Sequence, residues 1–169
     1  YNSYKQLEDY CFKVAGTVGM LSSSIFRCEE SIIKSYAIKL GLSLQLINIL
    51  RDINEDLNIG RFYFPQDELK KFELTESDFR KKLEINESLE SLESFLSFQI
   101  KRIEDIYKES QALLPKSCKE NQISSIIMGK IYMKILKKIK KKPLNALLKK
   151  VHISPLSKVL TSISVFFVN

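Results

Sequence analysis

The apolar residues of this chain recur every three or four positions along most of its length, which is the period of an α-helix. Leu92, Leu96 and Ile100 follow this spacing, whereas Lys101 and Glu104 fall on the opposite face. Every predicted element is helical, so the expected fold class is all-α. The predicted helices lie near residues 4–22, 30–57, 75–83, 87–113, 120–141 and 155–166.

Polar and acidic side chains interrupt the otherwise apolar helix predicted for residues 30–57. They stand at steps of three, four and four residues, and they are Gln45, Asn48, Asp52 and Asp56. Residues at this spacing share one face of a helix. The rest of the circumference is apolar, so we expect a buried helix with one polar stripe. The apolar positions are Leu44, Leu46, Ile47, Ile49, Leu50 and Ile53.

The acidic part of this stripe indicates a metal. Two carboxylates one turn apart in apolar surroundings do not both stay ionised unless a positive charge lies nearby. Oxygen ligands without His or Cys favour a hard ion, and Mg²⁺ prefers one or two carboxylates together with water and substrate phosphates. Arg51 and Arg61 flank the acids and are suited to phosphate oxygens. The pattern therefore predicts a metal-bridged diphosphate.

Three other interpretations of the stripe compete with a metal site. The aspartates could be solvated, with Arg51 as an ordinary ion-pair partner. A calcium loop is set aside, because its sixth and twelfth positions hold Leu57 and Tyr63 instead of Gly and Glu. The third interpretation is a helix stop at residues 58–60, with Pro65 preventing a restart. This last one is compatible with a binding site.

Three motifs in fixed order carry a resemblance to a known family. They are YCxxVAGTVG from Tyr10, QLxNILRDxxED from Gln45 and GRxYxP from Gly60. The stretch from Leu40 to Leu69 resembles the second half of the squalene and phytoene synthases, which join two prenyl diphosphates head to head. The resemblance implies an isoprenoid synthase-type helical bundle that is incomplete at its N-terminus.

The resemblance also implies roles for individual residues. The implied metal ligands are Asn48, Asp52 and Asp56. The implied catalytic residues are Asp52, Asp56 and Arg51. The implied substrate contacts are Gln45, Arg51, Arg61, Tyr10 and Tyr132. The implied walls around the prenyl chains are Val14, Val18, Gly19 and Leu44. For each apolar residue taken alone, ordinary core packing is the simpler explanation.

The activity implied is condensation of farnesyl or geranylgeranyl diphosphate with Mg²⁺-assisted loss of diphosphate. The tail at residues 149–158 resembles that of bacterial enzymes that make presqualene diphosphate, which favours presqualene diphosphate or squalene as product. Phytoene synthase is the alternative, and a non-catalytic assembly factor of the same fold is another. NADPH is possible as a cofactor, although no GxGxxG fingerprint is visible.

The family carries a first DxxxD motif upstream of the element at Tyr10, and only nine residues precede Tyr10 here. We therefore expect residues 1–169 to be the C-terminal portion of a single domain that is inactive alone. The three cysteines are an odd number without a CxxC pair, which is typical of reduced thiols in a cytoplasmic protein.

Charge is uneven along the chain. Residues 101–169 hold 15 Lys and Arg against 4 Asp and Glu. No nucleic-acid motif accompanies this basic tail, so we expect no nucleic-acid partner. Basic residues beside the apolar C-terminus would suit peripheral contact with the inner face of an anionic membrane, and a solvated Lys-rich face is the alternative. The apolar stretch is too short to span a bilayer.

Overall fold

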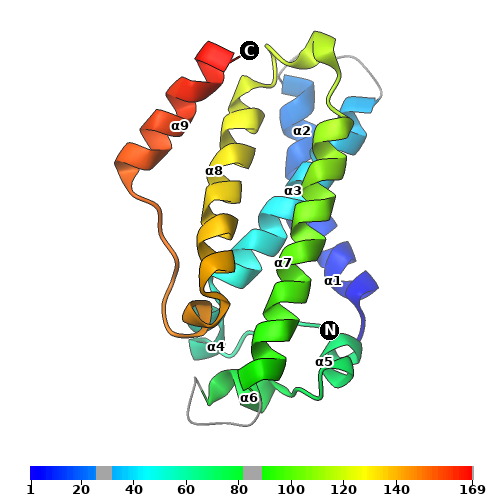
Figure 1. Ribbon diagram of the computed structural model, residues 1–169. Coiled ribbons are helices and arrows are strands. Elements are labelled where there is room, and N and C mark those ends of the chain that lie inside the picture. The colour runs from blue at the N-terminus through cyan, green and yellow to red at the C-terminus, as the bar shows by residue number, and fades with distance from the viewer. Residues whose placement is uncertain (26–31, 82–88, 169) are drawn as a thin grey trace.

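The structure is a computed structural model, and it describes residues 1–25, 32–81 and 89–168. Regular structure in these ranges is entirely helical, which confirms the all-α prediction (Figure 1). The α-helices are α1 (Tyr4–Cys11), α2 (Thr17–Ile25), α3 (Ile32–Arg51), α4 (Ile53–Asn58), α5 (Gln66–Lys71), α6 (Glu76–Arg80), α7 (Leu89–Ala112), α8 (Ile123–Lys141) and α9 (Pro155–Val168). A π-helix, η1 (Phe12–Gly16), joins α1 to α2, and two short 3-10 helices are η2 (Lys116–Cys118) and η3 (Pro143–Leu147).

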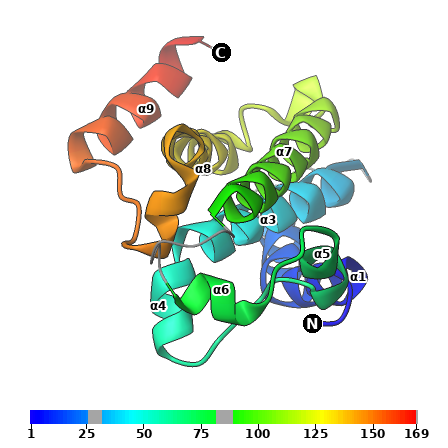
Figure 2. The ribbon, with the colours of Figure 1, turned by 60° about the horizontal axis from the view of Figure 1, so that its bottom comes forward.

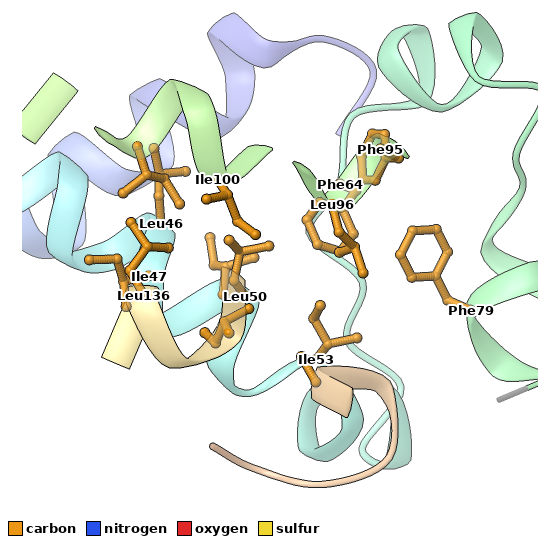
Figure 3. Packing of buried hydrophobic residues seen from close by; sticks show 14 of the residues in the cluster. Leu46, Ile47, Leu50, Ile53, Phe64, Phe79, Phe95, Leu96, Ile100 and Leu136 are labelled. Carbon is orange, nitrogen blue, oxygen red and sulfur yellow. The ribbon is translucent and has the colours of Figure 1, made fainter. Parts of the chain in front are cut away.

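Helix α3 is the centre of the bundle, with α2, α7 and α8 packed around it (Figures 1 and 2). Its apolar residues are buried on several sides, as the sequence predicts for a helix that is apolar nearly all round. Figure 3 shows Leu46, Ile47 and Leu50 against Ile100 of α7 and Leu136 of α8. Burying each such side chain contributes about 1.5–3 kcal/mol, so this contact fixes the position of α3.

A second part of the core is aromatic. Phe64, Phe79 and Phe95 pack with ring centroids 5.1–5.8 Å apart (Figure 3). Phe79 belongs to α6, and Phe95 belongs to α7. The cluster therefore joins the segment after the aspartates to the middle of the bundle.

Two glycines allow α3 to approach η1 and α2 closely. A Cβ atom added to Gly41 would lie 2.7 Å from the carbonyl oxygen of Ala15, and one added to Gly19 would lie 2.7 Å from that of Ala37. Both distances are shorter than the contacts that real Cβ atoms make, so close packing of these segments requires glycine at both positions.

Most of the predicted helices are present, with differences at their ends. The helix predicted at 4–22 is continuous but contains the π-helix η1. The helix predicted at 30–57 divides at Asp52 into α3 and α4. Residues 30–31, 82–83 and 87–88, at the ends of three predicted helices, lie outside the described ranges. Helix α5 is not among the predicted elements.

The helix stop expected at residues 58–60 is confirmed, but Pro65 does not prevent a restart, because it is the N-cap residue of α5. Helix α4 ends at Asn58, and Gly60 follows with φ +74°, a left-handed conformation that favours glycine. Helix α6 begins with a capping box between Thr75 and Asp78. The expectation of three reduced cysteines is wrong for Cys118, which is disulfide-bonded, whereas Cys11 is a buried free thiol.

Helix α9 lies along the outer side of α8 (Figure 2). Thr161 and Val165 are buried in this contact, and Lys134 of α8 donates to the Thr161 hydroxyl at 2.6 Å. The opposite face of α9 is apolar and exposed. In the ranges that the structure describes, no helix is both long and apolar enough to cross a membrane.

Candidate functional site

The polar stripe continues across the break between α3 and α4. Asp52 has φ −104° and ψ 12°, outside the helical region, but its N–H donates to the Asn48 carbonyl at 2.9 Å. The N–H of Asp56 in turn donates to the Asp52 carbonyl at 2.8 Å. Because the hydrogen bonds keep the spacing of four residues, the stripe stays on one side despite the break.

Asp52 is the best-paired residue of the stripe. Arg51 donates from Nε to Oδ1 at 2.8 Å and from Nη2 to Oδ2 at 2.6 Å, a bidentate arrangement. Both side chains are only 19% exposed, so the interpretation of a freely solvated aspartate is not supported. The guanidinium of Arg51 also lies 6.0 Å from the ring centroid of Tyr132.

A second cation reaches this carboxylate from the C-terminal segment. The Nζ atom of Lys150 lies 3.1 Å from Oδ1 of Asp52 and 2.6 Å from Oε2 of Glu55. The side chain of Lys150 is 29% exposed. Lys150 thus links the loop before α9 to the acidic end of the bundle, across 95 residues of sequence.

The two aspartates have pKa values shifted in opposite directions. Burial raises the pKa of Asp52, but hydrogen bonds and charges from Arg51 and Lys150 outweigh burial and hold it below the ordinary value. Burial, followed by the charge of Asp52, raises the pKa of Asp56. The charges of Arg61 and Lys150 lower the pKa of Asp56, but they do not outweigh these two causes.

Asn48 presents a polar atom without a partner. Its amide nitrogen donates to the Gln45 side-chain oxygen at 3.3 Å, while its Oδ1 atom is buried and has no hydrogen bond. An oxygen in this state is available to a cation. Asn48, Asp52 and Asp56 offer only oxygen donors, which is the ligand type that Mg²⁺ prefers.

The protein supplies only part of such a coordination shell. Within the described ranges, no group of three or more His, Cys, Asp or Glu side chains is placed to hold a metal ion. Two carboxylates and one amide leave several positions open, as is typical of Mg²⁺ that also binds substrate phosphates.

An apolar cavity of about 250 Å³ begins beside this stripe. It lies between α2, α3 and α8, and the sequence-predicted residues that line it are Val14, Val18, Gly19, Leu44, Gln45, Asn48 and Tyr132. Val14 and Val18 are 41% and 57% exposed, so one side of the cavity is open. The structure therefore brings the predicted wall residues together with Asn48. Asp52 and Asp56 do not line this cavity, and Asp56 lines a separate small pocket with Arg61 and Tyr63.

Tyr10 and Arg61 do not join this cavity. Tyr10 packs against Tyr1 and Tyr63, with ring centroids 5.7 and 5.5 Å away, and a hydrogen bond with Tyr63 is the main reason that its pKa is raised. Arg61 is exposed beside the same tyrosines, and its charge lowers the pKa of Asp56. These two residues line a separate, open pocket together with Tyr1, Phe62 and Tyr63.

Lys150 is the residue of the site that sequence analysis missed. It belongs to the segment 149–158, for which the sequence indicates a family resemblance but no contact with the aspartates. Its contact with Glu55 and Asp52 depends on the path of η3 and the loop after it, for which a single sequence contains no signal.

The fold and the site define an all-helical protein with an acidic, metal-suited face at one end of an apolar cavity. Residues 1–157 match the family model described as squalene/phytoene synthase. The chain belongs to the squalene/phytoene synthase family, as the three motifs indicated.

Curated relatives include phytoene synthase 2, chloroplastic, of Solanum lycopersicum, which is 30% identical over 95% of this chain and 53% of the relative. Phytoene synthase 1, chloroplastic, of Zea mays is 37% identical over 66% of this chain and 28% of the relative. The chain spans about half or less of the length of these relatives.

Solved structures agree with the fold. A dehydrosqualene synthase crystallised in complex with ligand has a TM-score of 0.73 and 26% identity, covering 98% of this chain and 57% of that one. The squalene synthase HpnC from Alicyclobacillus acidocaldarius has a TM-score of 0.70 and 24% identity, covering 84% of this chain and 52% of that one. The expected isoprenoid synthase-type bundle is thereby confirmed.

Proposed function

We propose that this chain contributes one half of the active site of a prenyltransferase that condenses two prenyl diphosphates head to head. The observation that supports this most strongly is that Asn48, one turn before Asp52, lines an apolar cavity with a buried side-chain oxygen that has no partner. A diphosphate and its prenyl chain need a polar and an apolar environment next to each other.

In this proposal Asn48, Asp52 and Asp56 would hold Mg²⁺ through their side-chain oxygens. Mg²⁺ supplies Lewis-acid assistance to the leaving diphosphate oxygens when it is bound. Arg51 and Lys150 already lie at Asp52, so their positive charges are close to where the diphosphate would sit. Both side chains can donate to phosphate oxygens.

The cavity would bind the prenyl chain and exclude water from the allylic cation that forms when diphosphate leaves. Val14, Val18, Gly19 and Leu44 would form the wall, and the Tyr132 ring would face the cation from the end near Arg51. The double bond of the second substrate would then attack this cation, and transfer of a proton from the resulting cation to the departed diphosphate would close the ring, giving a cyclopropylcarbinyl diphosphate. Gln45 would position the diphosphate end.

The product is proposed as presqualene diphosphate or squalene, with phytoene as the alternative. The names of the curated relatives favour phytoene, whereas the solved structure with 26% identity is that of a dehydrosqualene synthase. An assembly factor is the less supported possibility, because Gln45, Asn48, Asp52 and Asp56 are all intact.

The test uses the protein encoded by the complete reading frame. It is incubated with Mg²⁺ and either farnesyl or geranylgeranyl diphosphate, with and without NADPH, and the products are identified by mass spectrometry. A head-to-head product that requires Mg²⁺ is expected. An absence of product and of diphosphate release with both substrates would overturn the proposal.

We also propose peripheral contact with an anionic membrane through α9. Its outward side chains are apolar and 45–67% exposed, and they are Leu156, Val159, Leu160, Ile163 and Phe166. Exposed lysines on the adjoining end of α8 include Lys137, Lys138 and Lys141. An apolar helix face beside basic residues suits anionic lipid.

Co-sedimentation with vesicles tests this contact. Binding to phosphatidylserine vesicles is expected to exceed binding to phosphatidylcholine vesicles, and to fall in Leu160→Glu. The matched control is Leu148→Glu, which changes an exposed leucine outside α9. Equal sedimentation of the wild type with and without vesicles would contradict the contact.

A further inference from the structure

A buried glutamine lines the apolar cavity and lacks a hydrogen-bond partner. Gln122 precedes α8, is 1% exposed and is among the cavity-lining residues. Its side-chain Nε2 atom has no partner. A buried amide left unpaired is costly, which indicates that something else satisfies it in the working protein.

The neighbours of Gln122 do not supply the missing hydrogen-bond partner. The hydroxyl of Ser125 lies 2.8 Å from the Gln122 backbone carbonyl, 3.1 Å from its side-chain oxygen and 2.9 Å from the Tyr36 hydroxyl. If the amide is turned over, its nitrogen can donate to Ser125 and its oxygen becomes the unpaired atom. In either orientation one polar atom of Gln122 remains unpaired, and a water molecule or a hydroxyl group suits both.

This polar group lies far from the aspartates. Ser125 bonds to Tyr36 in the first turns of α3, whereas Asn48 lies twelve residues later on the same helix. At 1.5 Å per residue, the two positions are about 18 Å apart along α3. The cavity therefore has a polar, metal-suited end at Asn48 and a second polar point at Gln122, with apolar wall between them.

We propose that Gln122 limits the length of the prenyl chain that the cavity accepts. A chain that stops short leaves room for a water molecule on the Gln122 amide. A chain one isoprene unit longer covers the amide with hydrocarbon and leaves it unpaired. This inference rests on the proposed function, and it names the C15 chain as the preferred substrate over the C20 chain.

The test measures binding of the unreactive farnesyl and geranylgeranyl S-thiolodiphosphates by calorimetry in Mg²⁺. The wild type is expected to bind the farnesyl compound more tightly. Gln122→Met, which is similar in size and lacks the amide, is expected to tighten geranylgeranyl binding by about tenfold, the size associated with one unpaired buried polar group. Farnesyl binding should change much less.

Two further variants make the result interpretable. Gln66→Met makes the same change at an exposed glutamine of α5, and it should leave both affinities unchanged. Gln122→Leu provides a second apolar side chain if Met disturbs folding, which thermal unfolding would reveal. An unchanged affinity ratio in the folded Gln122 variants would overturn the inference and leave the proposed function standing. Failure of the wild type to bind either compound would overturn both.

Discussion

Two arginine–carboxylate pairs of similar burial have different surroundings. Glu68 of α5 is 4% exposed, accepts from Gln99 at 2.8 Å and from Arg102, and has both carboxylate oxygens paired within the protein. The Arg102 guanidinium lies 3.8 Å from the ring centroid of Tyr4. This cluster joins α1, α5 and α7, and the side chains of Glu68, Gln99 and Arg102 are paired with one another.

The pair of Arg51 and Asp52 belongs to an open cluster, in which some polar groups have no partner. The Glu68 cluster is called closed. Lys150 is shared between Asp52 and Glu55, and Oδ1 of Asn48 has no partner. Asp56 forms no ion pair with any described residue. A closed cluster contributes to stability, whereas an open one with unpaired oxygen atoms is suited to binding a cation and a diphosphate.

The largest effect that would test this comparison is on activity. Asp52→Ala removes a proposed metal ligand, so kcat/KM of the full-length protein should fall by about 100-fold or more. Glu55→Ala, one turn away and outside the stripe, should retain turnover. Steady-state assays with Mg²⁺ and prenyl diphosphate measure both. Full activity in Asp52→Ala would contradict the assigned role.

Substitutions in the closed cluster around Glu68 should lower the free energy of unfolding. Glu68→Ala leaves Arg102 buried without its carboxylate, so the free energy of unfolding should fall by about 3–5 kcal/mol. Glu76→Ala breaks the more exposed pair with Arg80 and should cost at most about 1 kcal/mol. Urea unfolding followed by circular dichroism compares them. Equal losses in the two variants would remove the distinction between closed and exposed pairs.

A substitution of Lys150 should have a smaller effect, which concerns the metal affinity of the open cluster. Lys150→Met removes a cation that competes with metal for Asp52, so Mn²⁺ should bind about fivefold more tightly in the absence of substrate, corresponding to about 1 kcal/mol. Electron paramagnetic resonance of free Mn²⁺ measures this affinity. Lys149→Met, at the exposed neighbour, is the control. Weaker Mn²⁺ binding in Lys150→Met would show that Lys150 does not compete.

The smallest expected effect concerns pH in metal-free buffer. The pKa of Asp56 is raised in the folded state, so its contribution to stability is lost as pH rises from the ordinary value of 3.8 through the raised one. Asp56→Asn should therefore be slightly more stable than wild type at neutral pH, by less than about 1 kcal/mol.

Asp52 should show the opposite sign. Its lowered pKa contributes stability above pH 3.8 that is lost as pH falls through the folded value. Thermal unfolding of the wild type, Asp56→Asn and Asp52→Asn across acidic and neutral pH in EDTA would measure both. Parallel pH profiles for the two variants would be inconsistent with this assignment.

Local features of this molecule could be predicted from the sequence, and long-range contacts could not. The periodicity of α3 and α7 indicated the helices, and the steps from Gln45 to Asp56 indicated the polar stripe. Helix α5 was missed because six mostly polar residues show no apolar period. The placement of Tyr10 away from the cavity and of Lys150 at Asp52 depends on tertiary contacts, which one sequence does not specify.

The two glycines of the helix contacts have a consequence for how this cavity could change during evolution. Gly19 and Gly41 hold backbone against backbone, so any larger residue there would push the helices apart. The dimensions of the cavity can then vary only through the side chains that project into it, such as Val14, Val18 and Leu44. The volume and shape of the cavity in descendants of this protein should therefore diverge by side-chain replacement on an unchanged backbone.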